Sequence, residues 1–217
     1  MVQGESSLRH RRGSPPSFPD RGHQVRKEIR RDLRQQRRDL TSAQQRRHAH
    51  AAANLLTRLP QFASSRRLAI YLQNDGELDT GPIAVMAWQR GKSCYLPVLR
   101  PGRQSRLSFA LYTPDGALRP NRFGIPEPLG TRLHAPRQID LVLVPLVAFD
   151  LNGNRLGMGG GFYDRTFAYR RRGGMGKPLL IGLAHDLQGV RSLRRYPWDV
   201  PLDGIVTERA WYPTPRR

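Results

Sequence analysis

The sequence predicts an α/β protein: a three-layer α/β/α sandwich with a mostly parallel sheet. Short apolar segments alternate along the chain with segments of helical periodicity, which is typical of strand–helix–strand units. Residues 139–148 form a nearly continuous apolar run, as expected of a central parallel strand covered on both faces. The length of 217 residues fits one domain, or one domain with a tail.

The chain begins with a polar segment and continues with a helical one. Residues 1–24 mix Arg, Ser, Pro and Gly without hydrophobic periodicity, so we predict a disordered basic tail before a folded domain over residues 25–217. From Val25 the pattern becomes helical, with a sparse apolar stripe that includes Ile29 and Leu33 and with arginines on the other faces. A helix is therefore expected directly after the tail.

A second helix is predicted from its capping signal. Thr41 is followed three residues later by Gln44, the spacing of a capping box, in which the two side chains bind each other's backbone N–H groups. The helix is expected to run through an alanine-rich stretch to Leu56, and Pro60 follows its end.

Strands and helices alternate through the rest of the chain. The predicted strands are 67–72, 93–99, 107–112, 139–148, 179–184 and 204–206, and the predicted helices are 80–90 and 162–172. In open α/β sheets ligands bind at the carboxyl ends of the strands, so the loops that follow them are the first place to look for a site.

Composition excludes several classes of protein. No segment approaches the roughly 20 apolar residues that span a bilayer, and the N-terminus lacks the apolar core of a secretory signal. Cys94 is the single cysteine, which excludes an internal disulfide and a cysteine-based metal site, and its apolar surroundings predict a buried, inert side chain. We expect a soluble, cytoplasmic protein that is a monomer.

The charge balance is strongly basic. The chain carries 37 Lys and Arg against 17 Asp and Glu, a net charge of +20, and such a field attracts nucleic acid, nucleotides and polyglutamylated cofactors alike. Residues 1–50 hold 13 basic and 5 acidic residues, a net charge of +8. A non-catalytic nucleic-acid-binding protein is therefore one alternative, with the basic tail as the contact, although no known nucleic-acid-binding motif is present.

The strongest chemical signal is a glycine-rich loop after the 139–148 strand. Residues 155–164 read RLGMGGGFYD, with four glycines directly before a predicted helix. Glycine permits positive φ and close backbone approach, so successive N–H groups can converge on an anion, and a helix N-terminus adds partial positive charge. Arg155 offers a guanidinium to phosphate, and Asp164 offers the carboxylate that Mg²⁺ prefers.

The alternative interpretation of this loop is a turn that only lets a helix pack closely on the sheet. The loop is not a Walker A motif, because no Gly-Lys-Ser/Thr follows, and it lacks the glycine spacing of a dinucleotide fingerprint. The residues by themselves therefore predict a phosphate-binding site and nothing more specific.

Several blocks of the sequence, taken together, resemble the 5-formyltetrahydrofolate cyclo-ligase family, also called methenyltetrahydrofolate synthetase. The family pattern P-x-x-x-F-D…G-x-R-L-G-x-G-x-G-[YF]-Y-D stands here as residues 145–164. Further matching blocks are 27–31, 74–80, 95–98 and 125–128. The resemblance runs over about residues 25–207 and leaves out the tail.

The resemblance implies a fold similar to the NagB, ribose-5-phosphate isomerase and CoA-transferase sandwiches. It also implies a ligase reaction (EC 6.3.3.2) in which MgATP converts 5-formyltetrahydrofolate into 5,10-methenyltetrahydrofolate, ADP and phosphate. In that reaction the formyl oxygen takes the γ-phosphoryl group, and N10 then closes the ring. Such chemistry needs positioning and charge neutralisation more than a protein nucleophile.

The resemblance also implies roles for individual residues. The expected ATP-binding residues are Lys27, Arg31, Arg155, Leu156, Gly157, Met158, Gly159, Gly160, Gly161, Phe162 and Tyr163, of which Arg155 and Tyr163 are the expected catalytic residues. The expected folate-binding residues are Leu72, Glu77, Phe123, Met158, Gly159, Gly160, Gly161 and Phe162. Asp164 and Asp199 are expected to hold Mg²⁺.

Each role has a simpler alternative. Lys27 and Arg31 would otherwise be solvated helix charges, and Glu77 and Asp199 would be ordinary turn residues. His185, which follows a predicted strand, is interpreted as a structural histidine and not as a general base. The chain also departs from the family, because many relatives have a basic residue or a Tyr at positions that are here Met158, Gly160 and Phe162. A sugar-phosphate isomerase or CoA-transferase on the same fold is a further alternative, which predicts turnover without ATP.

Overall fold

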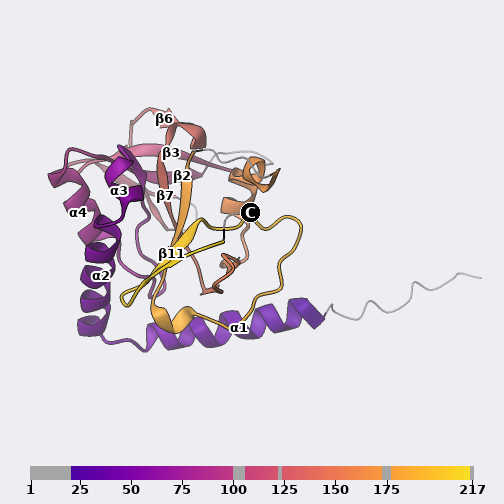
Figure 1. Cartoon of the computed structure of the whole chain (residues 1–217). Helices are drawn as coiled ribbons and strands as arrows, with labels where there is room; N and C mark the ends of the chain where they lie inside the picture. The colour runs from indigo at the N-terminus through magenta and orange to yellow at the C-terminus, as the bar shows by residue number, and fades with distance from the viewer. Residues whose placement is uncertain (1–20, 100–105, 122–123, 173–176, 216–217) are drawn as a thin grey trace, which may run out of the picture.

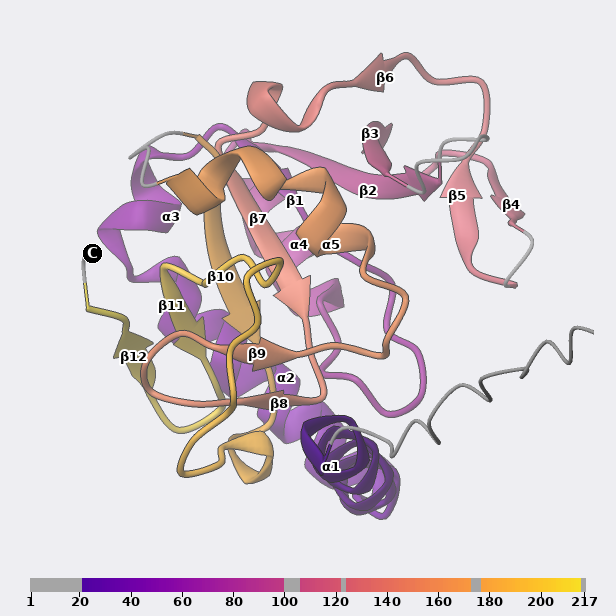
Figure 2. The same ribbon diagram turned by 90° about the vertical axis from the view of Figure 1, so that its right-hand side faces the viewer.

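A mixed sheet of eight strands forms the centre of the computed structural model, which describes residues 21–99, 106–121, 124–172 and 177–215. The strand order is β12-β11-β10-β7-β1-β2-β3-β6 (Figures 1 and 2). These strands are β1 (Arg67–Ala69), β2 (Ser93–Leu99), β3 (Leu107–Tyr112), β6 (Leu133–His134), β7 (Leu141–Pro145), β10 (Leu179–Leu183), β11 (Gly204–Val206) and β12 (Trp211–Pro213). Two hairpins are separate from the sheet: β4 (Leu118–Pro120) with β5 (Pro126–Pro128), and β8 (Ala148–Phe149) with β9 (Arg155–Leu156).

The helices are mostly in the first half of the chain. The α-helices are α1 (Arg21–Arg38), α2 (Ser42–Thr57), α3 (Pro60–Ser64), α4 (Gly81–Gln89) and α5 (Phe162–Thr166). The 3₁₀ turns are η1 (Pro136–Gln138), η2 (Ala168–Arg172) and η3 (Asp186–Gln188). Among the described residues, no helix combines the length and apolar content needed to cross a bilayer.

Strand β7 lies in the middle of the sheet, parallel to both of its neighbours, β10 and β1. Its first four residues are at most 1% exposed, which confirms the prediction of a central strand covered on both faces. Parallel pairing extends from β11 through β10, β7 and β1 to β2. Strands β3 and β6 at one edge and β12 at the other pair antiparallel, so the sheet is mostly parallel with antiparallel edges.

Helical segments cover both faces of the sheet and give the predicted three layers. Adjacent side chains of β7 point to opposite faces: Leu143 belongs to the apolar cluster that includes Ala87 of α4, and Val142 to the cluster that includes Phe167 after α5. Figure 1 shows α2 and α4 on the left of the sheet and the orange α5 segment on the right. Cys94 is fully buried in the first cluster, as predicted, and burial raises the pKa of its thiol to about 12.

Helix α1 does not cover a face. It lies across the end of the sheet, where it contacts β8 and η3, and Figure 2 views it almost along its axis below β8. It begins at Arg21, four residues before the predicted start, so the predicted tail of residues 1–24 is too long. The physical reason is tertiary: His23 packs on the Tyr196 ring with centroids 5.9 Å apart, and Arg26 donates to the Arg194 carbonyl at 2.7 Å. Residues 1–20 lie outside the described residues.

The β8–β9 hairpin was not predicted, and it positions the start of the glycine loop. The Asp150 carboxylate accepts hydrogen bonds from the backbone N–H groups of Asn152 and Asn154, both at 3.0 Å, which fixes the turn between the two strands. Gly153 sits in that turn with φ of 78°, a conformation that favours glycine. The hairpin therefore delivers Arg155 to a defined place at the end of the sheet.

The capping box of α2 is present as predicted and supplies a direct test of local stability. The Thr41 side chain accepts from the Gln44 backbone N–H at 3.2 Å, and the Gln44 side chain accepts from the Thr41 backbone N–H at 2.9 Å. Thr41→Ala should lower the free energy of unfolding by about 1 kcal/mol and Tm by about 2–4 °C, measured by thermal denaturation. Ser42→Ala, one position along the same helix, is the control and should leave Tm unchanged. Equal losses in the two variants would contradict the role of the cap.

Candidate functional site

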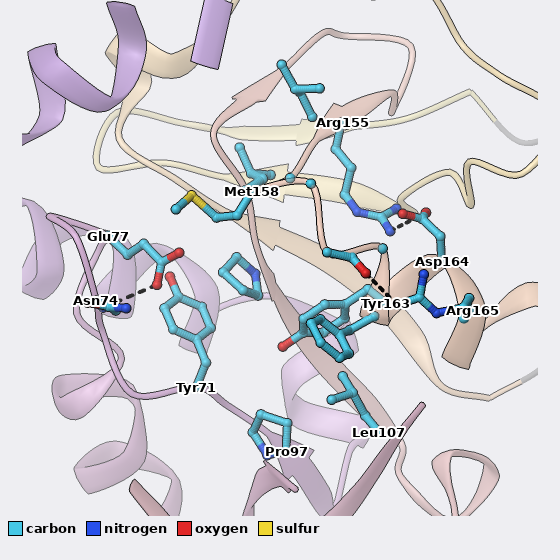
Figure 3. Close-up of a pocket in the computed structure, with 18 of the residues that line it drawn as sticks. Tyr71, Asn74, Glu77, Pro97, Leu107, Arg155, Met158, Tyr163, Asp164 and Arg165 are labelled. Carbon is cyan, nitrogen blue, oxygen red and sulfur yellow. Dashed lines mark hydrogen bonds and ion pairs between the residues drawn. The ribbon is translucent and has the colours of Figure 1, made fainter. Parts of the chain in front are cut away.

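A cavity of about 680 Å³ opens where α1, the segment after β1, the edge of β2 and the glycine loop meet. Figure 3 shows that Glu77 and Tyr71 lie on one side, with Arg155 and Asp164 on the other, and that Tyr163 lies between them. These residues are far apart in the sequence, so the cavity is created by the tertiary fold.

The glycine loop forms one wall of this cavity. Gly159 and Gly161 have φ values of 108° and 63°, in the region that favours glycine, and an added Cβ at Gly159 would meet no atom within 4 Å. The Gly157 carbonyl accepts a hydrogen bond from Arg30 Nε at 2.8 Å, which ties the loop to α1. The loop therefore presents bare backbone to an open space, which is the property that an anion cradle needs.

The helix behind the loop is shorter than predicted. A single helix over 162–172 was expected, whereas α5 ends at Thr166 and the 3₁₀ turn η2 follows. Tertiary packing explains the break, because the buried Phe167 turns into the core between the two segments. A helix of five residues has few aligned peptide dipoles. The positive character of the site therefore comes mainly from arginine side chains and loop N–H groups.

Arg155 is buried, and its guanidinium forms hydrogen bonds within the protein. Its Nη1 donates to the Val200 carbonyl, and its Nη2 donates to Asp164 Oδ1 at 2.6 Å. Val200 N–H also donates to Asp164 Oδ1, at 3.0 Å. Arg155 thus holds Asp164 in place, and this ion pair lies on the wall of the cavity.

The basic residues of α1 that face the cavity are not the two that were predicted. Arg26 and Arg30 line the cavity, whereas Lys27 and Arg31 are exposed on the outside of the helix. The Arg31 side chain is 75% exposed and pairs with its neighbour Asp32. The structure therefore places the predicted phosphate contacts Lys27 and Arg31 outside the cavity, and the basic residues that line it stand one position earlier in each case.

Helical geometry explains why Arg26 and Arg30 face the cavity and Lys27 and Arg31 do not. At about 100° per residue, Arg26 and Arg30 lie within roughly 60° of Leu33 around the helix axis, whereas Lys27 and Arg31 lie roughly 120° or more away. Leu33 is the buried residue of the α1 stripe and packs against the start of the glycine-loop hairpin. The apolar stripe was visible in the sequence, and measuring the angle of each basic residue from it would have selected the pair that lines the cavity.

Asp75, in the loop after β1, gathers three arginines of α1. Its carboxylate accepts from Arg34 and from Arg37, both at 2.7 Å, and from Arg38. Burial acts to raise the pKa of Asp75, but the three hydrogen bonds outweigh it and hold the pKa at about 2. The Arg37 side chain has no exposed surface and also donates to the Asp75 and Leu146 carbonyls. This network fixes α1 to the loop that carries Glu77.

Glu77 is the carboxylate of the cavity with the most altered acidity. Burial raises its pKa to about 7, although Arg37, at 4.0 Å, acts in the opposite direction. One of its oxygens accepts from the Asn74 backbone N–H at 3.2 Å. Burial also raises the pKa of Tyr71 and Tyr163, so both phenols are neutral. Glu77 is therefore a titratable acceptor that lies beside two neutral phenol groups.

Asp199 lies at the rim of the cavity and is paired. Its Oδ2 accepts from Arg26 at 2.6 Å and from the Tyr196 backbone N–H at 2.9 Å. The Tyr196 ring stacks on the Trp198 ring with centroids 4.8 Å apart, and the Arg26 guanidinium lies over the Tyr196 ring, 4.3 Å from its centroid. The structure therefore brings Asp199 to the same cavity as Asp164, with an arginine beside each carboxylate.

The remaining predicted residues either line the cavity or lie outside the described part of the chain, and further residues line the cavity without having been predicted. Leu72 and the glycine-loop residues 155–163 line the cavity as expected. Phe123 lies outside the described residues. Residues that line the cavity and were not predicted are His23, Arg26, Arg30, Tyr71, Asn74, Asp75, Leu96, Pro97, Leu99, Leu107, Asn121, Ile125, Pro126, Glu127, Pro145, Leu146, Arg165, Arg171, Tyr196 and Trp198. The blocks 95–98 and 125–128 match the family pattern, and the structure shows that residues of both blocks line the cavity.

Comparison with known proteins gives the family. Residues 22–208 match the 5-formyltetrahydrofolate cyclo-ligase family. This chain belongs to that family. The 5-formyltetrahydrofolate cyclo-ligase of Escherichia coli is 42% identical over 182 residues, which cover 82% of this chain and 98% of that protein. The Haemophilus influenzae protein of the same name is 39% identical over 185 residues, which cover 84% and 97%.

A solved structure agrees with this assignment. The Aquifex aeolicus 5,10-methenyltetrahydrofolate synthetase superposes with a TM-score of 0.75 at 32% identity and covers 87% of this chain and 92% of that one. The family consists of ATP-dependent ligases of folate metabolism. Both the α/β fold with its mostly parallel sheet and the family resemblance are thereby confirmed.

The raised pKa of Glu77 predicts how stability depends on pH. Because the folded-state pKa of about 7 exceeds the unfolded value of 4.5, the folded state holds this proton over that range, and stability is lost as pH rises through it. The unmodified protein should therefore lose stability relative to the Glu77→Gln variant as the pH rises from 4.5 to 7. The difference between their free energies of unfolding should fall by on the order of 3 kcal/mol over this range. Urea denaturation at several pH values measures the difference, in which the other groups cancel. A flat difference would show that Glu77 titrates normally.

Proposed function

We propose that this chain catalyses the MgATP-dependent conversion of 5-formyltetrahydrofolate to 5,10-methenyltetrahydrofolate, with release of ADP and phosphate. The observation that carries the proposal is one cavity that joins a glycine-loop anion cradle, unpredicted arginines of α1 and the carboxylate of Glu77. The family membership supports the same reaction. The expectations of a monomer and of a cytoplasmic protein stay predictions.

The nucleotide is assigned to the side of the cavity formed by the glycine loop and α1. Arg26 and Arg30 bring two guanidinium groups to this side, and the loop from Gly157 to Gly161 offers backbone N–H groups to phosphate oxygens. Burial lowers the pKa of Arg30, and the neighbouring Arg26 acts in the same direction. A bound polyanion would relieve this repulsion, which favours a phosphate chain between the two arginines and the loop.

Folate is assigned to the opposite side. Leu72, Leu96 and Pro97 line the cavity there, and Tyr71 and Glu77 supply its polar groups. A flat pterin ring suits apolar walls, and its amino N–H groups are donors that a carboxylate accepts. Met158 and Phe162 of the glycine loop would then lie beside the folate, because the loop borders both halves of the cavity. Their departures from the family pattern leave an apolar surface there.

Asp164 and Asp199 are assigned to the magnesium ion. For Asp164 both hydrogen bonds end on Oδ1, and for Asp199 both end on Oδ2. Each carboxylate therefore keeps one oxygen to which no residue in the described part of the chain donates. Mg²⁺ binds one or two carboxylates together with phosphate oxygens and water, so the two residues fit the ion. When bound, the ion would neutralise charge on the phosphate chain.

The reaction then needs little covalent chemistry from the protein. The formyl oxygen attacks the γ-phosphorus and ADP leaves, after which N10 attacks the activated carbon and phosphate departs. Phosphoryl transfer of this kind is accelerated by positioning and by neutralising charge. Arg155 contributes by holding Asp164, and Arg26 and Arg30 stabilise charge that develops on the transferred group.

The alternative of a nucleic-acid-binding protein finds less support in the described residues. Arg34, Arg37 and Arg38 converge on Asp75, and Arg26 pairs with Asp199, so much of the basic character of α1 is used within the molecule. The alternative of an isomerase or CoA-transferase predicts turnover without ATP. Both alternatives are outcomes of the experiment below.

The deciding experiment incubates the purified protein with MgATP and 5-formyltetrahydrofolate and follows the absorbance of methenyltetrahydrofolate. Product should form only when both ATP and Mg²⁺ are present, and ADP should appear in equal amount. Absence of ATP-dependent product over a range of pH and salt would overturn the proposal. Steeply salt-dependent RNA binding in the same preparation would then favour the first alternative.

A matched pair of variants tests the face of α1 that binds ATP. Arg30→Ala should raise the KM for ATP roughly tenfold or more, because a hydrogen bond to a charged group contributes about 1.5–3 kcal/mol. Arg31→Ala removes the same charge from the next position but from the exposed face, and it should change KM less than about twofold, as expected of a solvated surface charge. Steady-state kinetics at saturating folate measure both. Equal effects would show that bulk charge, and not the cavity face, binds the nucleotide.

A further inference from the structure

A second cluster of chemically active side chains lies away from the cavity. His48 of α2, His185 two residues after β10, and Glu208 two residues after β11 bring their ligand atoms within 4.8 Å of one another. The two histidine Nδ1 atoms are 3.0 Å apart, and His48 Nδ1 is 3.7 Å from Glu208 Oε1. None of the three lines the cavity described above. It is the one such group of His, Cys, Asp and Glu found among the described residues.

The two separations from His48 Nδ1 are close to the edge length of a small coordination polyhedron. Ligand atoms at about 2.0–2.1 Å from a tetrahedral zinc ion lie about 3.3 Å from each other. The observed distances of 3.0 and 3.7 Å lie on either side of that value. Two imidazoles and one carboxylate are also a donor set that late first-row divalent ions prefer, in contrast to the all-oxygen set that suits Mg²⁺.

The surroundings of His185 hold its ring in the state that binds a metal. Its Nε2 lies 3.2 Å from the Gly76 carbonyl, and because a carbonyl only accepts, Nε2 carries the proton. Nδ1 therefore keeps its lone pair and points it at His48. A histidine that binds a metal through one nitrogen and donates the other N–H to a backbone carbonyl is the usual arrangement in metal sites. His185 has no exposed surface, so this orientation is fixed by packing.

Glu208 is held in a similar way. Its Oε2 accepts a hydrogen bond from the Asp186 backbone N–H at 2.9 Å, which leaves Oε1 toward the imidazoles. The side chains of Glu208 and His48 are 12% and 22% exposed, so solvent reaches the cluster from one side. A metal ion therefore has an entry path and a water for its fourth position.

We propose that His48, His185 and Glu208 form a binding site for one divalent transition-metal ion of the Zn²⁺ or Co²⁺ type, with water as the fourth ligand. The site joins α2, the end of β10 and the end of β11. Through His185 it also reaches Gly76, which lies between Asp75 and Glu77 in the loop of the main cavity. Metal binding would therefore stabilise the fold and this loop together. The proposal does not depend on the reaction proposed above.

The experiment uses the full-length protein, freed of metal with a chelator and dialysed. Titration with CoCl₂ should give one tight site with the visible absorption of tetrahedral Co²⁺, and calorimetry with ZnCl₂ should give the same stoichiometry. His48→Gln and Glu208→Ala should each weaken binding at least tenfold and remove the spectrum. His50→Gln, an exposed histidine on the same helix, is the control and should bind as the unmodified protein does. Saturating ZnCl₂ should raise Tm in the unmodified protein and in this control only.

Two outcomes would overturn the proposal. One is an unmodified protein that shows no tetrahedral Co²⁺ spectrum and no Zn²⁺-dependent rise in Tm. The other is a folded His48→Gln variant that binds both ions as the unmodified protein does. In either case the contact between His48 and His185 is a simple hydrogen bond beside Glu208. His48 and Glu208 are partly exposed, and circular dichroism of each variant confirms that the loss of binding is not a loss of fold.

Discussion

The site depends on one buried ion pair, between Arg37 of α1 and Asp75 in the loop after β1. A guanidinium without exposed surface is tolerated only when its charge and its donors are matched, and here Asp75 supplies both a carboxylate oxygen and a carbonyl. The same guanidinium donates to the Leu146 carbonyl just beyond β7 and approaches Met158 Sδ at 3.8 Å. One side chain thus holds together α1, the Glu77 loop, the end of the central strand and the glycine loop.

That constraint explains the distribution of charge in a very basic chain. Three acidic residues that line the cavity pair with arginines: Asp75 with three of them, Asp164 with Arg155, and Asp199 with Arg26. Glu77 differs from these three, since burial dominates and raises its pKa to about 7. The cavity therefore combines fixed ion pairs, which position its walls, with the buried carboxylate of Glu77, whose protonation can respond to a ligand. The net charge of +20 says less about function than this pairing does.

Local patterns predicted much of the fold. The bounds of β2, β3 and β11 agree with the predicted 93–99, 107–112 and 204–206, because apolar runs bounded by turn residues define such strands. The α2 cap was also correct, since a capping box lies within four residues of sequence. The start of α1, the break after α5 and the β8–β9 hairpin were missed. The first two depend on packing partners remote in the sequence, which periodicity does not detect, and the hairpin strands have only two residues each, too few to show an alternating pattern.

The site, like the fold, has features that the sequence predicted and features that only the tertiary structure determined. The glycine loop, Arg155 and Asp164 were found from the sequence, because their chemistry is concentrated in ten consecutive residues, and the family was recognised from the blocks around them. The packing of Leu33 against the β8–β9 hairpin fixes the rotation of α1, and this rotation determines which of its arginines face the cavity. The raised pKa of Glu77 and the meeting of His48, His185 and Glu208 were likewise decided by the tertiary structure. Sequence determines which groups the chain carries, but burial and distance between remote segments determine what those groups can do.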